Sequence, residues 1–170
     1  MIVLKTEMEA ILSDMDKVAG LFEEEPFDIY FLGGCACILG GYTERATMDF
    51  DFIDQEYSSR YGRVFAMLRD FDMLDYETAI LSPKYKERAF KLNAYKNVNA
   101  YILSVEDIIV SKIIRLADKD IEDINNLIEK ADKALINTII DEVTERNDLA
   151  ESKRKGFLSK LPKFRSDYNV

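Results

Sequence analysis

The sequence predicts one domain of the α/β (α+β) class, with a small mixed β-sheet flanked by helices and a helical C-terminal region. Three observations predict it: helical spacing opens the chain, short aromatic and β-branched runs follow, and helical spacing returns from residue 104. No internal repeat or Gly/Ser linker divides the 170 residues. We therefore expect a single domain over 1–170, with a sheet-bearing core over about 26–104 and a helical region over about 105–170.

The first predicted elements are a helix, a strand and a short helix. Apolar residues recur at helical spacing over 5–24, which predicts an amphipathic helix. Residues 27–32 (FDIYFL) are aromatic and β-branched and stop at the glycine pair 33–34, which is typical of a buried strand. Residues 35–39 then predict a short helix that runs into a second glycine pair.

The middle of the chain predicts the rest of the sheet and a crossover helix. Residues 47–54 (TMDFDFID) alternate hydrophobic and acidic side chains with the period of a strand. Residues 56–72 return to helical spacing and predict a helix. Further strands are predicted at 76–81, 89–92 and 98–103.

The C-terminal third is predicted to be helical throughout. Ser104 is a typical N-cap, because an acid follows three residues later and an apolar run comes next. The helical pattern predicts four helices, near 105–117, 119–131, 133–147 and 150–161.

Composition excludes several classes of protein. The chain has no His and only two Cys, which removes Ser-His-Asp and Cys-His mechanisms and sulfur-rich zinc sites. The longest uncharged stretch, 29–43, is shorter than the roughly 20 apolar residues that span a bilayer. Cys35 and Cys37 are too close in sequence for an ordinary disulfide. We therefore expect a cytoplasmic protein without a membrane segment, in which both cysteines are buried small side chains; a reactive thiol at Cys35 is the alternative.

Charge leaves two interpretations of the C-terminal end. The chain carries a net charge of -9 and should repel nucleic acid as a whole. The last 20 residues, in contrast, hold six Lys or Arg against two acids. This end is either a solvated helix face, which we favour, or a surface that contacts RNA.

The candidate chemistry is centred on two acids in the predicted strand 47–54. Asp49 and Asp51 share one face of it, with Cα atoms about 7 Å apart, while Phe50 and Phe52 point into the core. Two carboxylates so placed can share a Mg²⁺ ion, which prefers oxygen ligands. The alternative is an edge strand with solvated acids. Other Asp-x-Asp pairs occur at 14/16, 70/72 and 118/120, on or beside predicted helices where such residues diverge.

The glycine pair adds a second part to this candidate site. Gly33 and Gly34 stand at a turn from strand to helix, where backbone N–H groups and the lack of a Cβ give a phosphate room to approach. Together, the turn and the two acids form a coherent phosphate-plus-metal site.

A row of cations follows on the first helix of the C-terminal region. Lys112 interrupts the apolar stripe of this helix, so its ammonium needs an anionic partner. Arg115 and Lys119 face roughly the same way, which suits the β- and γ-phosphates of a nucleotide. The alternative is that Lys112 extends past its neighbours to solvent while the other two cations pair with Glu122 or Asp123. On the first interpretation, Asp120 and Asp123 would hold the cationic side chains in place.

These residues resemble a known family. The glycine pair 33–34 followed by Arg45-x-Thr47-x-Asp49-x-Asp51 resembles the signature of the polymerase-β-like nucleotidyltransferase superfamily, in particular its minimal members and the abortive-infection toxin-type enzymes. Residues 104–123 resemble the helical Lys, Arg and Lys-Asp-x-x-Asp motif of that subgroup.

The resemblance implies an activity and assigns roles. It implies a Mg²⁺-dependent enzyme that transfers a nucleoside monophosphate from an NTP to a hydroxyl group and releases pyrophosphate. Asp49 and Asp51 would be the catalytic metal ligands. The residues expected to bind substrate phosphates are Gly33, Gly34, Arg45, Thr47, Lys112, Arg115 and Lys119. The acceptor could be a small molecule, tRNA or a protein.

One departure from the family pattern keeps other functions open. Active members usually carry a third carboxylate on a later strand, but the expected strand has amides at Asn97 and Asn99, and Glu106 just beyond it should point elsewhere. A nucleotide-binding or partner-binding module without activity is therefore one alternative. A toxin-antitoxin component whose helical end binds an antitoxin-like protein is another.

Overall fold

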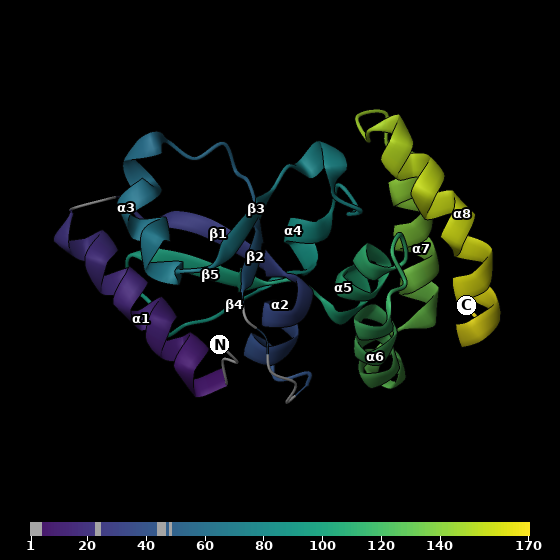
Figure 1. Ribbon diagram of the computed structural model, residues 1–170, viewed down its shortest axis with the longest axis horizontal. Coiled ribbons are helices and arrows are strands. Elements are labelled where there is room, and N and C mark those ends of the chain that lie inside the picture. The colour runs from purple at the N-terminus through teal and green to yellow at the C-terminus, as the bar shows by residue number, and fades with distance from the viewer. Residues whose placement is uncertain (1–4, 23–24, 44–46, 48) are drawn as a thin grey trace. The chain divides into compact units, whose positions relative to one another are not determined.

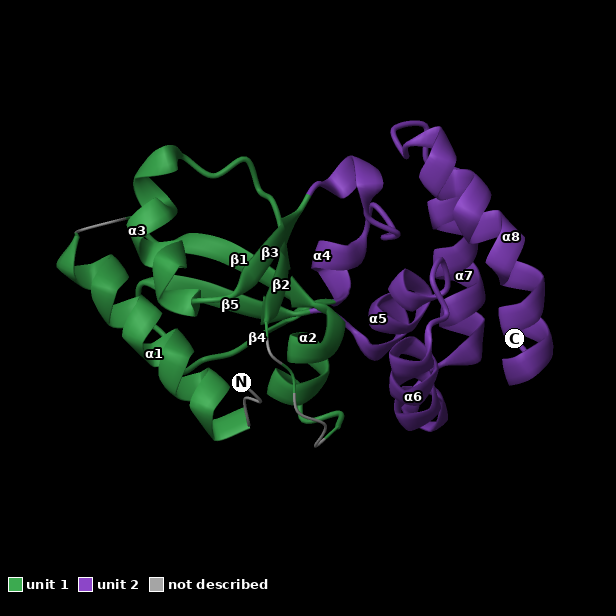
Figure 2. Cartoon of the chain, in the orientation of Figure 1, with its two compact units in different colours: residues 1–74, 89–102 green, residues 75–88, 103–170 purple. Residues whose placement is uncertain are grey.

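The computed structural model in Figure 1 describes residues 5–22, 25–43, 47 and 49–170. The chain forms two compact units (Figure 2): unit 1 comprises residues 1–74 and 89–102, and unit 2 comprises residues 75–88 and 103–170. The fold class is as predicted, with a mixed sheet flanked by helices and a helical C-terminal region. That the chain acts as one domain stays a prediction.

Unit 1 is built on a five-stranded mixed sheet with the order β3-β2-β1-β5-β4. The central strand β1 runs parallel to β5 and antiparallel to β2, while β3 is parallel to β2 and β4 is antiparallel to β5. The strands are β1 (Phe27–Leu32), β2 (Phe50–Ile53), β3 (Phe71–Leu74), β4 (Phe90–Lys91) and β5 (Val98–Ile102).

Aromatic side chains form the core on one face of this sheet. The rings of Phe27 in β1 and Phe52 in β2 lie 5.7 and 5.2 Å from the ring of Phe65 in α3. This packing follows from the alternation along β2, which buries its phenylalanines and turns Asp51 to the opposite face. The helices of unit 1 are α1 (Lys5–Leu21), α2 (Gly33–Leu39) and α3 (Gly62–Phe65), with 3₁₀ turns at Ser59–Tyr61 and Ala66–Leu68.

Unit 2 is helical. Ser104 caps α5 as predicted, because its hydroxyl accepts a hydrogen bond from the backbone N–H of Asp107. Phe157 and Phe164 of α8 are fully buried. The helices are α4 (Tyr85–Arg88), α5 (Val105–Lys112), α6 (Asp118–Leu127), α7 (Lys133–Thr144) and α8 (Glu151–Tyr168), with 3₁₀ turns at Tyr76–Thr78 and Ile128–Lys130.

The predicted helix over 56–72 is wrong at its C-terminal end. Helical structure stops at Leu68, Arg69 takes a positive φ of 67°, and Phe71 begins the edge strand β3. The helical spacing of the apolar residues extended through Phe71 in the sequence, but the Phe71 ring packs against Phe52 of the neighbouring strand. The Asp70/Asp72 pair is therefore not on a helix.

The predicted strand over 76–81 is also wrong. Its composition is typical of a strand, but the backbone carbonyls of Tyr76, Ala79 and Leu81 accept hydrogen bonds from the buried guanidinium of Arg146. The Arg146 guanidinium also lies 3.8 Å from the centre of the Tyr76 ring. Arg146, which lies two residues past the end of α7, thus provides the hydrogen bonds that a neighbouring strand would give.

Candidate active site

The glycine turn and the second strand meet at one point in unit 1. Gly33 is the first residue of α2 and has a φ of +70°, a conformation that L-residues avoid. A Cβ at this position would lie 2.4 Å from Oδ2 of Asp51. The absence of a side chain therefore lets the Asp51 carboxylate lie directly against the turn.

Three carboxylates gather at the same place. Asp51 lies in β2, Asp49 comes just before this strand, and Asp72 lies in β3 directly opposite Asp51 in the parallel register. Each carboxylate offers one oxygen, and the three oxygens lie within 4.8 Å of one another. Such a set fits a divalent cation that prefers oxygen ligands, because only small side-chain movements would bring all three within bonding distance. Of these acids, Asp51 lies against the glycine turn, and Asp49 and Asp72 lie close to Asp51.

Asp72 is the carboxylate that sequence reasoning missed. We expected the third acid on the strand around 97–101 and found amides there; in the structure, Asn99 donates a hydrogen bond to Asp28 at 3.0 Å. Glu106 is engaged in unit 2, where it accepts the backbone N–H of Asp132 at 2.9 Å. The available signal was the alternation of Phe71, Asp72 and Met73, which the helical spacing of the preceding residues obscured.

The thiol of Cys35 lies against the backbone of Asp51. Its side chain is fully buried, as predicted for both cysteines, and its Sγ donates a hydrogen bond to the carbonyl of Leu32 at 3.1 Å. Burial raises the pKa of the Cys35 thiol well above its usual range, and the nearby Asp51 carboxylate raises it further. This argues against the reactive-thiol alternative, since a thiolate is the reactive form.

Three more residues were predicted to bind phosphates: Gly34, Thr47 and Arg45. Gly34 lies in the first turn of α2, and Thr47 is a half-buried residue in an isolated bridge two residues before Asp49. Arg45 lies outside the described residues. The roles of these three in binding phosphates stay predictions.

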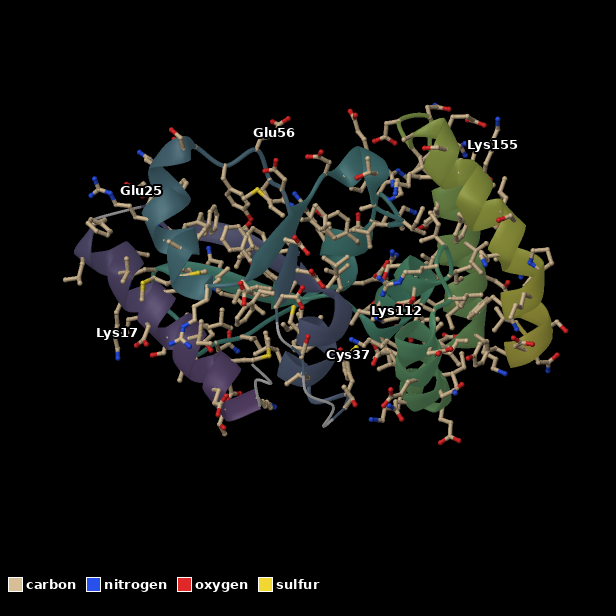
Figure 3. The ribbon with its side chains drawn as sticks, in the orientation of Figure 1. Lys17, Glu25, Cys37, Glu56, Lys112 and Lys155 are labelled. Atoms are coloured by element: carbon tan, nitrogen blue, oxygen red, sulfur yellow. The ribbon has the colours of Figure 1, made fainter. Side chains whose placement is uncertain are left out.

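In unit 2, Lys112 has the anionic partner that its position requires. Only 8% of its side chain is exposed, and its Nζ lies 2.9 Å from Oδ2 of Asp123 and 3.7 Å from Oδ1 of Asp120. Lys112 is labelled in Figure 3. Its charge is thus matched within its own unit, which explains how an ammonium is tolerated on an apolar face.

Arg115 and Lys119 face solvent more than Lys112 does. The guanidinium of Arg115 donates two hydrogen bonds to Asp120, at 2.6 and 2.8 Å, yet 69% of its side chain is exposed. Burial alone would raise the pKa of Asp120, but the hydrogen bonds from Arg115 and from the Ala117 backbone, with the charge of Lys112, hold it below its usual range. Lys119 is exposed.

The acids and the cations belong to different units, so a common phosphate site that joins them stays a prediction. Within unit 2, the carboxylates of Asp120 and Asp123 fix the cationic side chains. The guanidinium of Arg115 is therefore held by Asp120, although most of the side chain is exposed.

Some of the basic side chains of α8 form hydrogen bonds within unit 2. Arg154 donates hydrogen bonds to the carbonyls of Thr144 and Arg146, and Arg165 donates to Asn137. The Nζ of Lys163 lies 2.6 Å from Oδ2 of Asp167 in the same helix, so at least three of the six cations have structural partners within the fold. This weighs toward the solvated-face interpretation of that end.

The fold and the acidic cluster define a nucleotidyltransferase-like protein, and a comparison with protein families agrees. The model of the family described as "Nucleotidyltransferase of unknown function (DUF6036)" matches residues 6–168. The chain belongs to this nucleotidyltransferase family. No curated protein and no solved structure shows a significant match to this chain. Among the described residues, no helix combines the length and apolar character needed to cross a membrane.

Proposed function

We propose that the chain is a Mg²⁺-dependent nucleotidyltransferase that moves a nucleoside monophosphate from an NTP to a hydroxyl group of an acceptor. The observation that carries this proposal is the position of Asp72 opposite Asp51, with Asp49 adjacent. Three carboxylates that offer only oxygen fit a hard cation. The glycine turn lies directly against Asp51, so a phosphate bound by the backbone N–H groups of this turn would lie beside the cation.

The residues then have distinct tasks. Asp49 and Asp51 would hold the cation, which supplies neutralisation of the charge that shifts during an in-line displacement. The acceptor oxygen bonds to the α-phosphorus as the bond from this phosphorus to the pyrophosphate oxygen breaks. Asp72 is exposed on the edge strand; one of its carboxylate oxygens would complete the cation site, and the other would receive the hydroxyl proton of the acceptor. The sequence motif implies that Lys112, Arg115 and Lys119 bind the β- and γ-phosphates. Because Lys112 is buried against Asp123 and Asp120, the exposed Arg115 and Lys119 would make these contacts.

The presence of Asp72 weakens the main reason for an inactive module. That alternative rested on the apparent loss of the third carboxylate, and β3 supplies one from a different strand. Catalysis is therefore favoured over nucleotide binding without turnover.

Assignment to the abortive-infection toxin-type subgroup is part of the proposal and rests on the Arg45-x-Thr47-x-Asp49-x-Asp51 motif and on residues 104–123. It carries with it an antitoxin-like protein partner and a cytoplasmic location. The acceptor would be tRNA, a small molecule or a protein. The exposed lysines of α8, including Lys155 in Figure 3, give slight support to an RNA acceptor.

The test is nucleotide transfer with labelled NTPs and Mg²⁺, measured as pyrophosphate release and as label on added tRNA, protein and small-molecule pools. We expect activity in the wild type and a loss of at least about 100-fold in Asp51→Asn. Asp70→Asn is a matched control, because this exposed acid lies two residues before Asp72 and outside the cluster. Equal transfer by the wild type and by an Asp49→Asn/Asp51→Asn double variant would contradict the proposal.

A further inference from the structure

We infer that Cys35 is a positioning residue that fixes Asp51 against the glycine turn by accepting the backbone N–H of Asp51 and donating to the carbonyl of Leu32. The two contacts measure 3.3 and 3.1 Å at Sγ. The carbonyl of Asp51 lies 3.6 Å from the same sulfur and is a second, longer acceptor for its proton. The inference rests on the proposed function, because it gives Cys35 a role at the proposed cation site.

The geometry of the sheet places this thiol at the last residue pair of β1 and β2. Along β2, the backbone N–H groups of Phe50 and, just past its end, Asp54 donate to the backbone of β3 or the residue before it. Since N–H groups alternate along a strand, the N–H of Asp51 points the other way, toward β1. β1, however, ends at Leu32, where the chain turns into α2.

Cys35 completes the hydrogen bonding at this point. Leu32, the last residue of β1, is the register partner of Asp51, and the Cys35 Sγ lies at this last pair, where it accepts the N–H of Asp51. The same sulfur binds the residue that precedes Gly33. The thiol therefore joins the two halves of the site, the turn and the acid-bearing strand.

This link matters because the Asp51 carboxylate has little freedom. It lies so close to Gly33 that a Cβ there would be 2.4 Å away, and it must meet two other carboxylates within 4.8 Å. A displacement of the Asp51 backbone by a few tenths of an ångström would change both the contact with Gly33 and the spacing of the three carboxylates. We therefore expect the loss of the thiol hydrogen bonds to weaken cation binding more than the loss of a buried methyl-sized group alone would.

The chain supplies a matched control. Cys37, labelled in Figure 3, is equally buried on the same helix. The substitution Cys37→Ala also removes one buried sulfur atom from α2, two residues away from Cys35. Serine and alanine at position 35 have similar volumes, but only serine can donate and accept hydrogen bonds.

The experiment measures Mn²⁺ affinity by electron paramagnetic resonance for the wild type, Cys35→Ala, Cys35→Ser, Cys37→Ala and Cys37→Ser. We expect Cys35→Ala to lower the affinity about tenfold, Cys35→Ser to recover most of this loss, and both Cys37 variants to stay within about twofold of the wild type. In parallel, amide exchange of Asp51 followed by NMR should be faster in Cys35→Ala than in Cys35→Ser. If Cys35→Ala does not fold, Cys35→Ser still tests the inference, because the inference predicts that Cys35→Ser folds and binds Mn²⁺.

Each contrary outcome is distinct. Wild-type affinity in Cys35→Ala, or an equal loss in Cys37→Ala, would overturn the role of Cys35 and leave the proposed function intact. A folded Cys35→Ser variant that lost as much affinity as Cys35→Ala would also overturn it. Failure of the wild type to bind Mn²⁺ would overturn the proposed function and the inference together.

Discussion

Gly33→Ala perturbs both the backbone of the turn and the carboxylate beside it. Gly33 has a φ of +70°, and forcing an L-residue into this region costs about 1–2 kcal/mol. The added methyl group would also lie 2.4 Å from Oδ2 of Asp51, well inside van der Waals contact, although the Cβ of Asp51 itself is 3.5 Å away. The carboxylate can relieve this contact by rotating, but it then leaves the acidic cluster.

The expected result is therefore a modest loss of stability with a larger loss of cation binding. We predict a decrease of about 1–2 kcal/mol in the free energy of unfolding, which lowers the melting temperature by a few degrees for a chain of this size. Mn²⁺ affinity should fall by about tenfold or more.

Gly62→Ala provides the comparison. Gly62 has helical backbone angles, and a Cβ there meets nothing within 4 Å. This substitution should be neutral or stabilise the fold by up to about 1 kcal/mol, with unchanged Mn²⁺ affinity. Urea unfolding followed by circular dichroism gives the stabilities, and calorimetric titration gives the affinities. A Gly33→Ala variant with the same free energy of unfolding and the same Mn²⁺ affinity as Gly62→Ala would refute the close contact between the turn and Asp51.

Three further predictions concern the third acid, an ion pair and a buried arginine. Asp72→Asn should lower Mn²⁺ affinity at least tenfold in calorimetric titration while Asp70→Asn retains it; equal affinities would remove Asp72 from the site. The lowered pKa of Asp120 means that its contribution to stability is present above its ordinary value of 3.8 and is lost as the pH falls through the lower folded-state pKa. Asp120→Asn should therefore be less stable than the wild type at neutral pH, with a gap that narrows below about pH 4 in urea unfolding; a gap independent of pH would contradict this. Arg146→Met leaves three backbone carbonyls without their charged donor and should cost about 3 kcal/mol or more in the free energy of unfolding, with partial recovery in Arg146→Lys; a loss below about 1 kcal/mol would show that the carbonyls find other partners.

Much of the site was predictable because its signals are local. The alternation of Asp49 to Phe52 indicates which side chains face the core, and the two acids follow from the pleat of a strand. The glycine pair marks the turn that precedes α2, and Lys112 on an apolar face predicts an acidic partner nearby, which is Asp123. Each of these inferences needs only neighbours within one or two elements.

The missed features depend on contacts between distant segments. Asp72 joins the cluster only because β3 pairs in register with β2, and the helical spacing of residues 56–72 outweighs the short alternation that begins at Phe71. Residues 76–81 have the composition of a strand, yet Arg146, some 65 residues later, satisfies their carbonyls. Tertiary partners override local propensity in both cases.

The acidic cluster is tested most directly by a crystal structure of the protein with Mn²⁺ and a non-hydrolysable NTP. Anomalous scattering from manganese should give a peak bounded by Asp49, Asp51 and Asp72, with carboxylate oxygens about 2 Å away and the nucleotide phosphates on the side of Gly33. A peak elsewhere, or none when Mn²⁺ is in excess, would contradict the account.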